Sequence, residues 1–245
     1  MGGFYIGVDG KARKVKGGYI GIDGKARKLK KGYIGDENGI ARLCWSAEKK
    51  LGDFPVGATV YLNENGSPVE FYVAQHNYEP DLNGAGRTLL VRKDCYDMRK
   101  WHRTAVNAYA TSDIDAWLNS DYIGLLDDNI KDAIGTTKFR YTVGDGFRTL
   151  TTLNRSVFLL SIAELGCALS NANKEGSALP IADILSIAHY DGAAVSQWTR
   201  TPLTDSAYNT CYVLHNGSAV YASGSGNNFG SRPCFTLPDS VPFDL

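Results

Sequence analysis

The sequence predicts an α+β fold in which a short module of repeated β-hairpins precedes a larger mixed domain. Two observations indicate this fold. The first 43 residues repeat one motif three times, and after Trp45 the repeat gives way to β-branched runs that alternate with helix start signals. We therefore expect an N-terminal β-repeat anchor over residues 1–45, a charged linker over residues 46–54 and a folded domain over residues 55–245.

The repeat is built around tyrosines at Tyr5, Tyr19 and Tyr33, which recur every 14 residues. Each tyrosine opens a Tyr-Ile-Gly strand, and an Asp-Gly or Asn-Gly pair that favours a tight hairpin turn follows before a return strand. A unit of this size cannot bury an apolar face by itself, so the copies must stack on one another or on a partner. The segment is predicted to be a β-meander that attaches the protein to an assembly.

The repeats are strongly basic. Residues 1–31 hold nine Lys and Arg and two Asp, a local charge of +7, and the other residues balance this to a formal net charge of zero. One interpretation is a solvated edge that discourages sheet-to-sheet aggregation. Docking onto an acidic partner surface is the alternative. Charge and three tyrosines alone do not favour nucleic acid as a partner.

The cysteines and the N-terminal residues indicate the cellular compartment in which the protein folds. The five cysteines are widely spaced and lack a C-x-x-C pair, which predicts isolated buried thiols rather than a zinc ribbon or a redox motif. No apolar run reaches membrane-spanning length, and the N-terminus lacks the layout of a secretory signal. Ile6 stands where a myristoylation signal has Ser or Thr. We expect folding in a cytosol without membrane insertion.

The first strands of the larger domain are predicted from β-branched and aromatic runs. Residues 60–62 and 69–74 flank Asn65-Gly66 and should pair as a hairpin, and residues 89–91 should form a third strand. The apolar run at residues 157–160 is expected to be a buried strand.

Three helices are predicted from their start signals. Ser112 and Asp115 open the first as a capping box, and the spacing of Ile114, Trp117 and Leu118 places the tryptophan on the buried face. The second begins near Asp127-Asp128 and ends at Gly135. A third, over residues 161–166, is capped by Ser and Glu and stopped by Gly.

The C-terminal part has a different composition. A strand at residues 198–202 precedes a hairpin over residues 211–221 with Asn216-Gly217 at its turn, a loop over residues 222–228 and a closing strand over residues 229–237. Its polar positions are nearly all Asn, Ser, Thr, Tyr, Asp or His, which is the composition of adaptable binding loops. A polar surface without function is the alternative interpretation.

Several ordered motifs carry a family resemblance. They are Trp101-His102-Arg103, the helix from Tyr109 to Asn119, Val157-Phe158-Leu159-Leu160-Ser161, Trp198-Thr199-Arg200-Thr201-Pro202 and Gly230-Ser231-Arg232-Pro233-Cys234-Phe235. In this order they resemble an uncharacterised domain common in phages and gut Firmicutes. That domain looks like a relative of the C-type-lectin-like fold found in retroelement-diversified phage receptor-binding proteins and in formylglycine-generating enzymes. The resemblance covers about residues 55–238, and the N-terminal repeats are similar to those of phage structural proteins.

The resemblance implies a scaffold and a binding surface. Trp117, Trp198, Arg200 and Arg232 correspond to scaffold residues. The polar loops before the closing strand correspond to the receptor-contact surface. Its candidate residues here are Thr204, Asp205, Tyr208, Asn209, Tyr212, His215, Asn216, Tyr221, Ser225, Asn227 and Asn228. Strand alternation leaves Tyr212 as either a contact residue or a core residue.

The resemblance implies a phage virion protein that adheres to a host surface protein or glycan. Residues 1–45 would bind other virion proteins, and the protein would be a homo-oligomer, with a trimer as one option. A decoration protein without receptor binding is the alternative. An enzyme of the formylglycine-generating type is less favoured, because Cys211 and Cys234 lie 23 residues apart without a matching motif.

Other chemistry finds little support in the sequence. The four histidines accompany no hydrolase or zinc-protease motif. Asp205, Asn209, Asn227 and Asn228 offer oxygen ligands, but the closing loops lack the Glu-Pro-Asn signature of calcium-dependent lectins. We expect no catalytic residue, cofactor or metal site.

Overall fold

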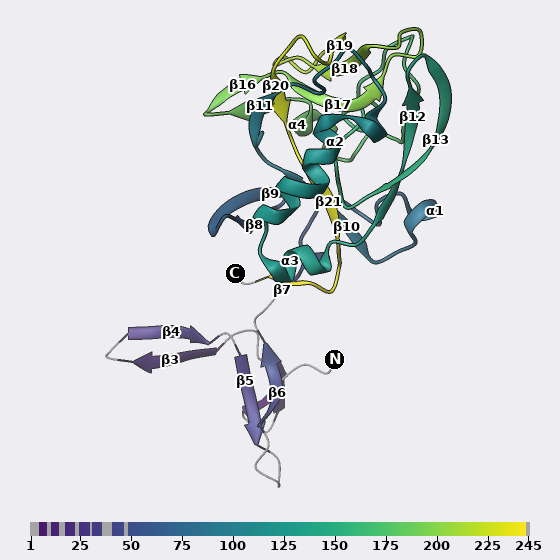
Figure 1. The fold of residues 1–245 in the computed structure, drawn as a ribbon. Coiled ribbons are helices and arrows are strands. Elements are labelled where there is room, and N and C mark those ends of the chain that lie inside the picture. The colour runs from purple at the N-terminus through teal and green to yellow at the C-terminus, as the bar shows by residue number, and fades with distance from the viewer. Residues whose placement is uncertain are drawn as a thin grey trace. The chain divides into compact units, whose positions relative to one another are not determined.

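The computed structural model describes residues 49–243 in full and, before them, only the backbone of six strands within residues 5–46. The chain divides into two compact units, Met1–Lys50 with Pro242–Leu245 and Leu51–Val241. Both are mostly β-structure, and the second adds a few short helices (Figure 1), so the coarse α+β prediction is confirmed. Among the described residues, no helix is long and apolar enough to cross a membrane.

In the first unit each repeat forms its own antiparallel hairpin. The strands are β1 (Tyr5–Val8), β2 (Lys11–Lys14), β3 (Gly18–Ile22), β4 (Lys25–Leu29), β5 (Lys31–Gly35) and β6 (Ala41–Ser46). They pair as β1–β2, β3–β4 and β5–β6. The predicted hairpins are thus confirmed, but the predicted meander is wrong for the described strands, because each Tyr-Ile-Gly strand pairs only within its own repeat. The turns and side chains of the repeats lie outside the described residues.

The segment predicted as a linker is partly structured. β7 (Lys49–Lys50) pairs with β22 (Pro242–Phe243), and η1 (Leu51–Asp53) follows it with the side chain of Leu51 fully buried.

The first large sheet of the second unit has the order β14-β21-β10-β9-β8 and is antiparallel throughout. Its strands are β8 (Thr59–Glu64), β9 (Ser67–His76), β10 (Arg87–Arg92), β14 (Val157–Phe158) and β21 (Cys234–Pro238). The three early strands are confirmed, and the buried strand predicted over residues 157–160 is confirmed for Val157–Phe158 only. Asn65 and Gly66 join β8 to β9 with φ angles of 50° and 73°, as the Asn-Gly pair predicts.

The second large sheet has the order β11-β20-β17-β18-β19, in which only β17 and β20 run parallel. Its strands are β11 (Asp97–Arg99), β17 (Gln197–Pro202), β18 (Asn209–Val213), β19 (Ala219–Ser223) and β20 (Phe229–Ser231). The predicted hairpin is confirmed as β18–β19. Its turn is a longer loop than the Asn-Gly pair predicts, since Leu214 and Ser218 form its closing hydrogen bond.

The predicted closing strand over residues 229–237 is divided between the two sheets as β20 and β21, so this prediction is wrong. Pro233 has no N–H to continue a ladder. The buried guanidinium of Arg232 donates instead to the carbonyl oxygens of Arg92, Lys93 and Leu185 at 2.8, 2.6 and 2.7 Å. This confirms the prediction that Arg232 is a scaffold residue.

Two further hairpins complete the strands. They are β12 (Thr137–Gly144) with β13 (Phe147–Arg155), and β15 (Ala188–Tyr190) with β16 (Ala193–Val195). In Figure 1 the long β12–β13 ribbon stands at one side of the unit, and β13 is its outermost strand.

The helices are short. They are α1 (Pro80–Asn83), α2 (Asp113–Trp117), α3 (Asp128–Ala133), α4 (Ala182–Leu185), the 3-10 helices η2 (Tyr109–Thr111) and η4 (Ile123–Leu125), and the π-helix η3 (Leu118–Tyr122). The first two predicted helices are confirmed as α2 and α3, and Ser112 caps α2 by accepting from the main-chain N–H of Asp115 at 3.2 Å.

Two helix predictions need correction. Trp117 is half-buried rather than a core residue. Its ring contacts that of buried Tyr122, and the guanidinium carbon of Arg99 lies 3.2 Å from the ring centroid. The third predicted helix is a single turn. Its capping box does form, with Ser161 and Glu164 bonded reciprocally at 2.8 and 3.1 Å. Gly166, with a φ of 74°, ends the turn.

Candidate functional site

The loop over residues 203–209 is held from beneath by the buried side chain of Asn107. Its amide nitrogen lies 2.7 Å from the carbonyl oxygen of Asn209, 2.9 Å from that of Ser206 and 3.3 Å from that of Leu203. A primary amide has two hydrogens to share among these acceptors. Because one buried group bonds carbonyls along the whole loop, the conformation of the 203–209 loop is fixed without a partner.

The start of the loop is fastened from two other segments. The main-chain N–H and the hydroxyl of Thr204 donate to the carbonyl oxygen of Asn171 at 2.8 and 3.0 Å. Nε of Arg148 donates to the carbonyl oxygen of Thr204 at 3.1 Å, and the amide of Asn171 lies 3.2 Å from both carboxylate oxygens of Asp205. Such preorganisation reduces the entropy lost when a loop binds.

The tip of the β12–β13 hairpin is tied to the same buried asparagine. Oδ1 of Asn107 accepts from the main-chain N–H of Asp145 at 2.7 Å. Gly144 has a φ of 82°, and a Cβ there would lie 2.5 Å from the carbonyl oxygen of Asn107, so this contact requires glycine. Asn107 thus joins the hairpin tip, where Phe147 is 62% exposed, to the loop, where Tyr208 is 53% exposed.

The predicted contact residues differ in exposure. The exposed ones are Asp205, Tyr208, His215, Asn216, Tyr221, Asn227 and Asn228, whereas Asn209, Tyr212 and Ser225 are half-buried and Thr204 is buried.

These residues fall into two groups at opposite ends of the β18–β19 hairpin. Asn209 pairs with Ser223, so the 203–209 loop and the loop over residues 224–228 share the open end. His215 and Asn216 lie at the closed end, about 15 Å away at the usual rise of roughly 3.3 Å per strand residue. The structure therefore brings most of the predicted residues together and separates these two from them.

Two predicted contact residues belong to the scaffold of this surface. Thr204 is only 8% exposed, and its hydroxyl donates to the carbonyl oxygen of Asn171, so it is not placed to meet a receptor directly. The ring of Tyr212 stacks on Phe229 with centroids 4.2 Å apart and meets buried Trp198 edge-on at 5.7 Å. Of the two roles that strand alternation allowed for Tyr212, the aromatic packing therefore favours the core role over the contact role.

Sequence reasoning did not find Phe147, Arg148 or Asn107. The Gly144-Asp145-Gly146 run could have predicted an exposed turn before Phe147. No local pattern marks Asn107, because its partners are 38 to 102 residues away.

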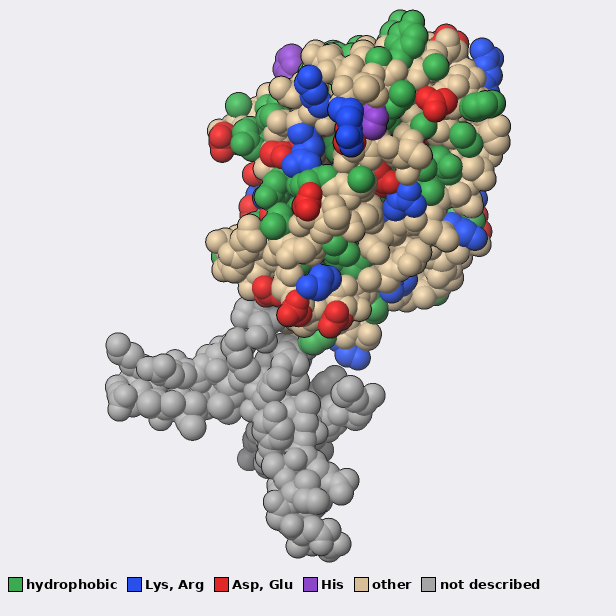
Figure 2. All heavy atoms as spheres, in the orientation of Figure 1, with side chains coloured by type: hydrophobic (Ala, Val, Ile, Leu, Met, Phe, Trp, Pro, Cys, Tyr) green, Lys and Arg blue, Asp and Glu red, His purple; other side chains and the backbone are tan. Residues whose placement is uncertain are grey.

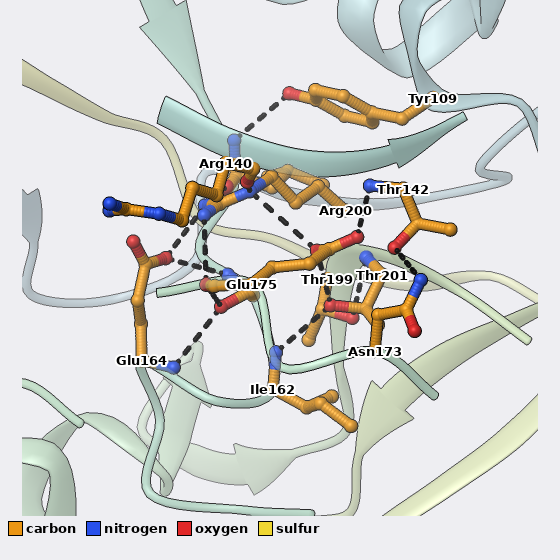
Figure 3. Close-up of polar contacts among 12 residues, drawn as sticks. Tyr109, Arg140, Thr142, Ile162, Glu164, Asn173, Glu175, Thr199, Arg200 and Thr201 are labelled. Atoms are coloured by element: carbon orange, nitrogen blue, oxygen red, sulfur yellow. Dashed lines mark hydrogen bonds and ion pairs between the residues drawn. The ribbon is translucent and has the colours of Figure 1, made fainter. Parts of the chain in front are cut away.

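A second polar cluster lies in the core around Arg200 of β17 (Figure 3). Nη1 of Arg200 lies 2.6 Å from a carboxylate oxygen of Glu164, and Nε lies 3.8 Å from one of Glu175. None of these side chains is more than 1% exposed. Burial raises the pKa of Glu175, although the charge of Arg200 acts in the opposite direction. The predicted scaffold role of Arg200 is confirmed.

This cluster bonds the edge of β12 that faces the core. Nε of Arg200 donates to the carbonyl oxygen of Arg140 at 3.2 Å, and the main-chain N–H of Thr142 donates to Glu175 at 2.6 Å. Figure 3 shows Glu175 between Thr142 and Thr201, whose hydroxyl donates to its other oxygen at 2.8 Å. The charges therefore hold β12 against β17.

A polar pocket of about 370 Å³ opens beside this cluster. On its wall, Arg140 binds the carboxylates of Glu79 and Asp81. Burial raises the pKa of Glu79, with Arg140 acting against it. Within residues 49–243, no group of three or more His, Cys, Asp or Glu side chains is placed to hold a metal ion.

The described thiols are free and mostly buried. Burial raises the pKa of Cys95 to about 11 and that of Cys211 to about 12, and it also raises the pKa of Cys234. Cys211 and Cys234, the pair on which the enzymatic alternative depends, lie in different sheets. The side chain of Cys44 lies outside the described residues.

The visible face of the second unit has a mixed charge. In Figure 2, Lys and Arg side chains lie interspersed with Asp and Glu side chains, so this face has no large patch of one sign.

Comparison with known proteins gives one match. No curated protein and no solved structure matches the chain. Residues 85–239 match a family described as "Domain of unknown function (DUF6273)". The matched region extends from just before β10 to the end of β21 and includes α2, the 203–209 loop and the β18–β19 hairpin. It covers more than half of the 245 residues, and the chain therefore belongs to the DUF6273 family.

Proposed function

We propose that this chain is a phage virion protein whose C-type-lectin-like domain adheres to a host surface protein or glycan. The observation on which this depends is the preorganised 203–209 loop, which presents an exposed tyrosine on a framework fixed by Asn107. Residues 1–45 would attach the protein to other virion proteins, as their repetition suggests.

The composition of the surface supports adhesion. Binding energy at interfaces concentrates in a few aromatic anchors surrounded by polar residues. Tyr208 and Phe147 would be the anchors, and Asp205, Asn227 and Asn228 would supply the polar surroundings. Since the loop is already ordered, little conformational entropy would be lost on binding.

The architecture is compatible with the C-type-lectin-like part of the proposal. Two five-stranded sheets are joined by long segments with little regular structure, and buried arginines bond the carbonyls of those segments. By its resemblance, the family would carry its binding surface in the loops before the closing strand, and the 203–209 loop would be one of these loops. A decoration protein using the same fold is the alternative.

A three-residue variant tests adhesion. Replacing Tyr208, Asn227 and Asn228 by alanine should leave the melting temperature nearly unchanged, because exposed substitutions each cost about 0.5 kcal/mol or less. Binding of the fluorescently labelled variant to host cells should fall to background.

The matched control is H215A/N216A, two exposed changes at the far end of the same hairpin, which should bind like the wild type. Full binding by a folded triple variant would place the contact surface elsewhere. No binding by the wild type would favour the decoration protein.

A further inference from the structure

The two edges of the β12–β13 ribbon differ in how their main-chain groups are bonded. On β12, every second residue turns its main-chain groups away from β13 and meets a side chain there. These contacts are Lys138 with Asn83, Arg140 with Arg200 and Thr142 with Glu175. On this core-facing edge of β12, each of the three residues therefore has at least one main-chain group bonded by a side chain.

The register of the ribbon fixes which groups of β13 face outward. Arg140 lies opposite Thr152, and Thr142 lies opposite Leu150. In an antiparallel ladder, the main-chain groups of two opposed residues point either toward each other or away from each other. Since those of Arg140 and Thr142 point away from β13, those of Leu150 and Thr152 point away from β12.

This outer edge of β13 is open at its centre. The carbonyl oxygen of Arg148 accepts from the amide of Asn173, and that of Asn154 accepts from the side chain of Arg155, both at 2.8 Å. Between them, the outward N–H and C=O groups of Leu150 and Thr152 bond to no other group in the described part of the chain. Figure 1 shows no element outside β13, and its residues 147–152 are exposed.

The open edge lacks the usual protection. Exposed edge strands are normally short, or they carry Lys or Pro, because a free edge pairs readily with another strand. β13 has nine residues without Lys or Pro. Its two charged residues, Arg148 and Arg155, lie toward its ends and bind Thr204 and Asp115 of the same chain, and its centre includes the 46% exposed side chain of Leu150. Such an edge is suited to pairing with an extended strand.

The free groups are complementary to themselves. If two copies of β13 pair antiparallel about Thr151, Leu150 lies opposite Thr152 of the partner subunit. The two N–H and two C=O groups that are free in each copy then all find partners, giving four main-chain hydrogen bonds. The register uses no group that is already bonded within a chain.

The side chains also fit this register. Arg148 would lie opposite the partner subunit's Asn154, and Phe147 opposite the partner subunit's Arg155. No two like charges face each other, and a guanidinium near an aromatic ring is favourable. A second copy has the same two open residues between carbonyls that are already bonded, so in this register both open stretches are filled at once, which favours a second copy as the occupant.

We propose that the outer edge of β13 is a self-association surface. Two chains join there about a two-fold axis through Thr151, and the two ribbons become one four-stranded antiparallel sheet. A two-fold interface of this kind closes on itself and leaves no open edge on β13. The proposed interface lies along β13 and includes Phe147, which also borders the proposed adhesion surface, but the proposal does not depend on the adhesion function.

Disulfide cross-linking of the full-length chain tests whether two copies of β13 pair about a two-fold axis through Thr151. Thr151→Cys places two thiols directly opposite each other at the axis, where the chains come closest. Thr149→Cys is the matched control, because it is the same exposed residue type on the same strand but lies opposite the partner subunit's Leu153. Under mild oxidation, the proposal requires a covalent dimer for Thr151→Cys alone, above the level formed by the wild type. Equal cross-linking of both variants, or of neither, would overturn it.

A second experiment measures association without a new thiol. The double change of Leu150 and Thr152 to lysine places like charges across the axis, so its sedimenting mass should fall relative to the wild type. Tyr61→Lys, an exposed change on the edge strand β8, is the control and should leave the mass unchanged. An unchanged mass for the double variant would contradict the proposal.

Discussion

The two edges of the β12–β13 ribbon differ in how their outward main-chain N–H and C=O groups are bonded. β12 faces the core, and side chains from distant segments bond main-chain groups of Lys138, Arg140 and Thr142, among them the buried and charged Arg200 and Glu175. β13 faces outward, and its central groups are left open. The difference shows that a strand edge can be closed without a neighbouring strand, provided that the side chains which close it are themselves fixed and charge-compensated.

The largest effect on stability is expected from removing the charge of Arg200, which bonds the core-facing edge of β12. Arg200→Met should lower the free energy of unfolding by about 3–5 kcal/mol, because Glu164 and Glu175 would remain buried without their counter-ion. Urea unfolding measures this. The control is Arg140→Met, whose side chain is 34% exposed and whose ion pairs should contribute about 1 kcal/mol or less. Similar small losses in both variants would contradict the role of Arg200 at this edge.

A smaller effect should appear as a pH dependence at the end of β13, where Arg155 binds Asp115 at 2.7 Å. Burial raises the pKa of Asp115 to about 6, with Arg155 acting against it. Between about pH 4 and pH 6, the folded protein therefore keeps a proton on Asp115 that the unfolded chain has lost. The contribution of Asp115 to stability is greatest below about pH 4 and falls as the pH rises through 6.

Asp115→Asn should abolish this fall. Between pH 4 and 7, the difference in unfolding free energy between the wild type and the variant should change by about 2–3 kcal/mol, on the basis of 1.36 kcal/mol per pKa unit. Denaturant unfolding at several pH values measures it. Parallel curves for the two proteins would show that Asp115 titrates normally.

The smallest effect on stability is expected from removing the amide of Asn173, which donates a hydrogen bond to the carbonyl oxygen of Arg148 in β13. Asn173→Ala should cost about 1 kcal/mol or less, because water can reach the carbonyl oxygen of Arg148 once the amide is gone. Thermal unfolding measures the loss, with the exposed change Asn154→Ala as its control. A loss as large as that of Arg200→Met would mean that the β13 edge also depends on buried bonding.

Predictions from local sequence succeeded where local chemistry decides the structure. The hairpin at Asn65-Gly66 and the helix opened by Ser112 follow from neighbouring residues and are present. The helix predicted from Ser161 fails because Glu164, although it forms its capping bond, also binds Arg200, and Gly166 ends the turn. Tertiary contacts decide that segment.

The candidate surface was predicted only in part for the same reason. Composition indicated Tyr208, Asp205, Asn227 and Asn228, which are exposed. It could not separate them from Asn216 at the other end of the hairpin, since strand pairing sets that distance. Nor could it find Asn107, whose role depends on acceptors that approach it only in the folded chain.

The division of the closing segment into β20 and β21 has a consequence for protein synthesis. β20 lies between β11 and β17, and β21 lies between β14 and β10, so one ten-residue stretch, Phe229–Pro238, supplies an interior strand to each large sheet. While the ribosome is still making the preceding residues, both sheets have a gap that no earlier strand fills. Completion of this unit must therefore follow translation of that stretch, and a nascent chain halted before Phe229 would expose two unfinished sheets to chaperones.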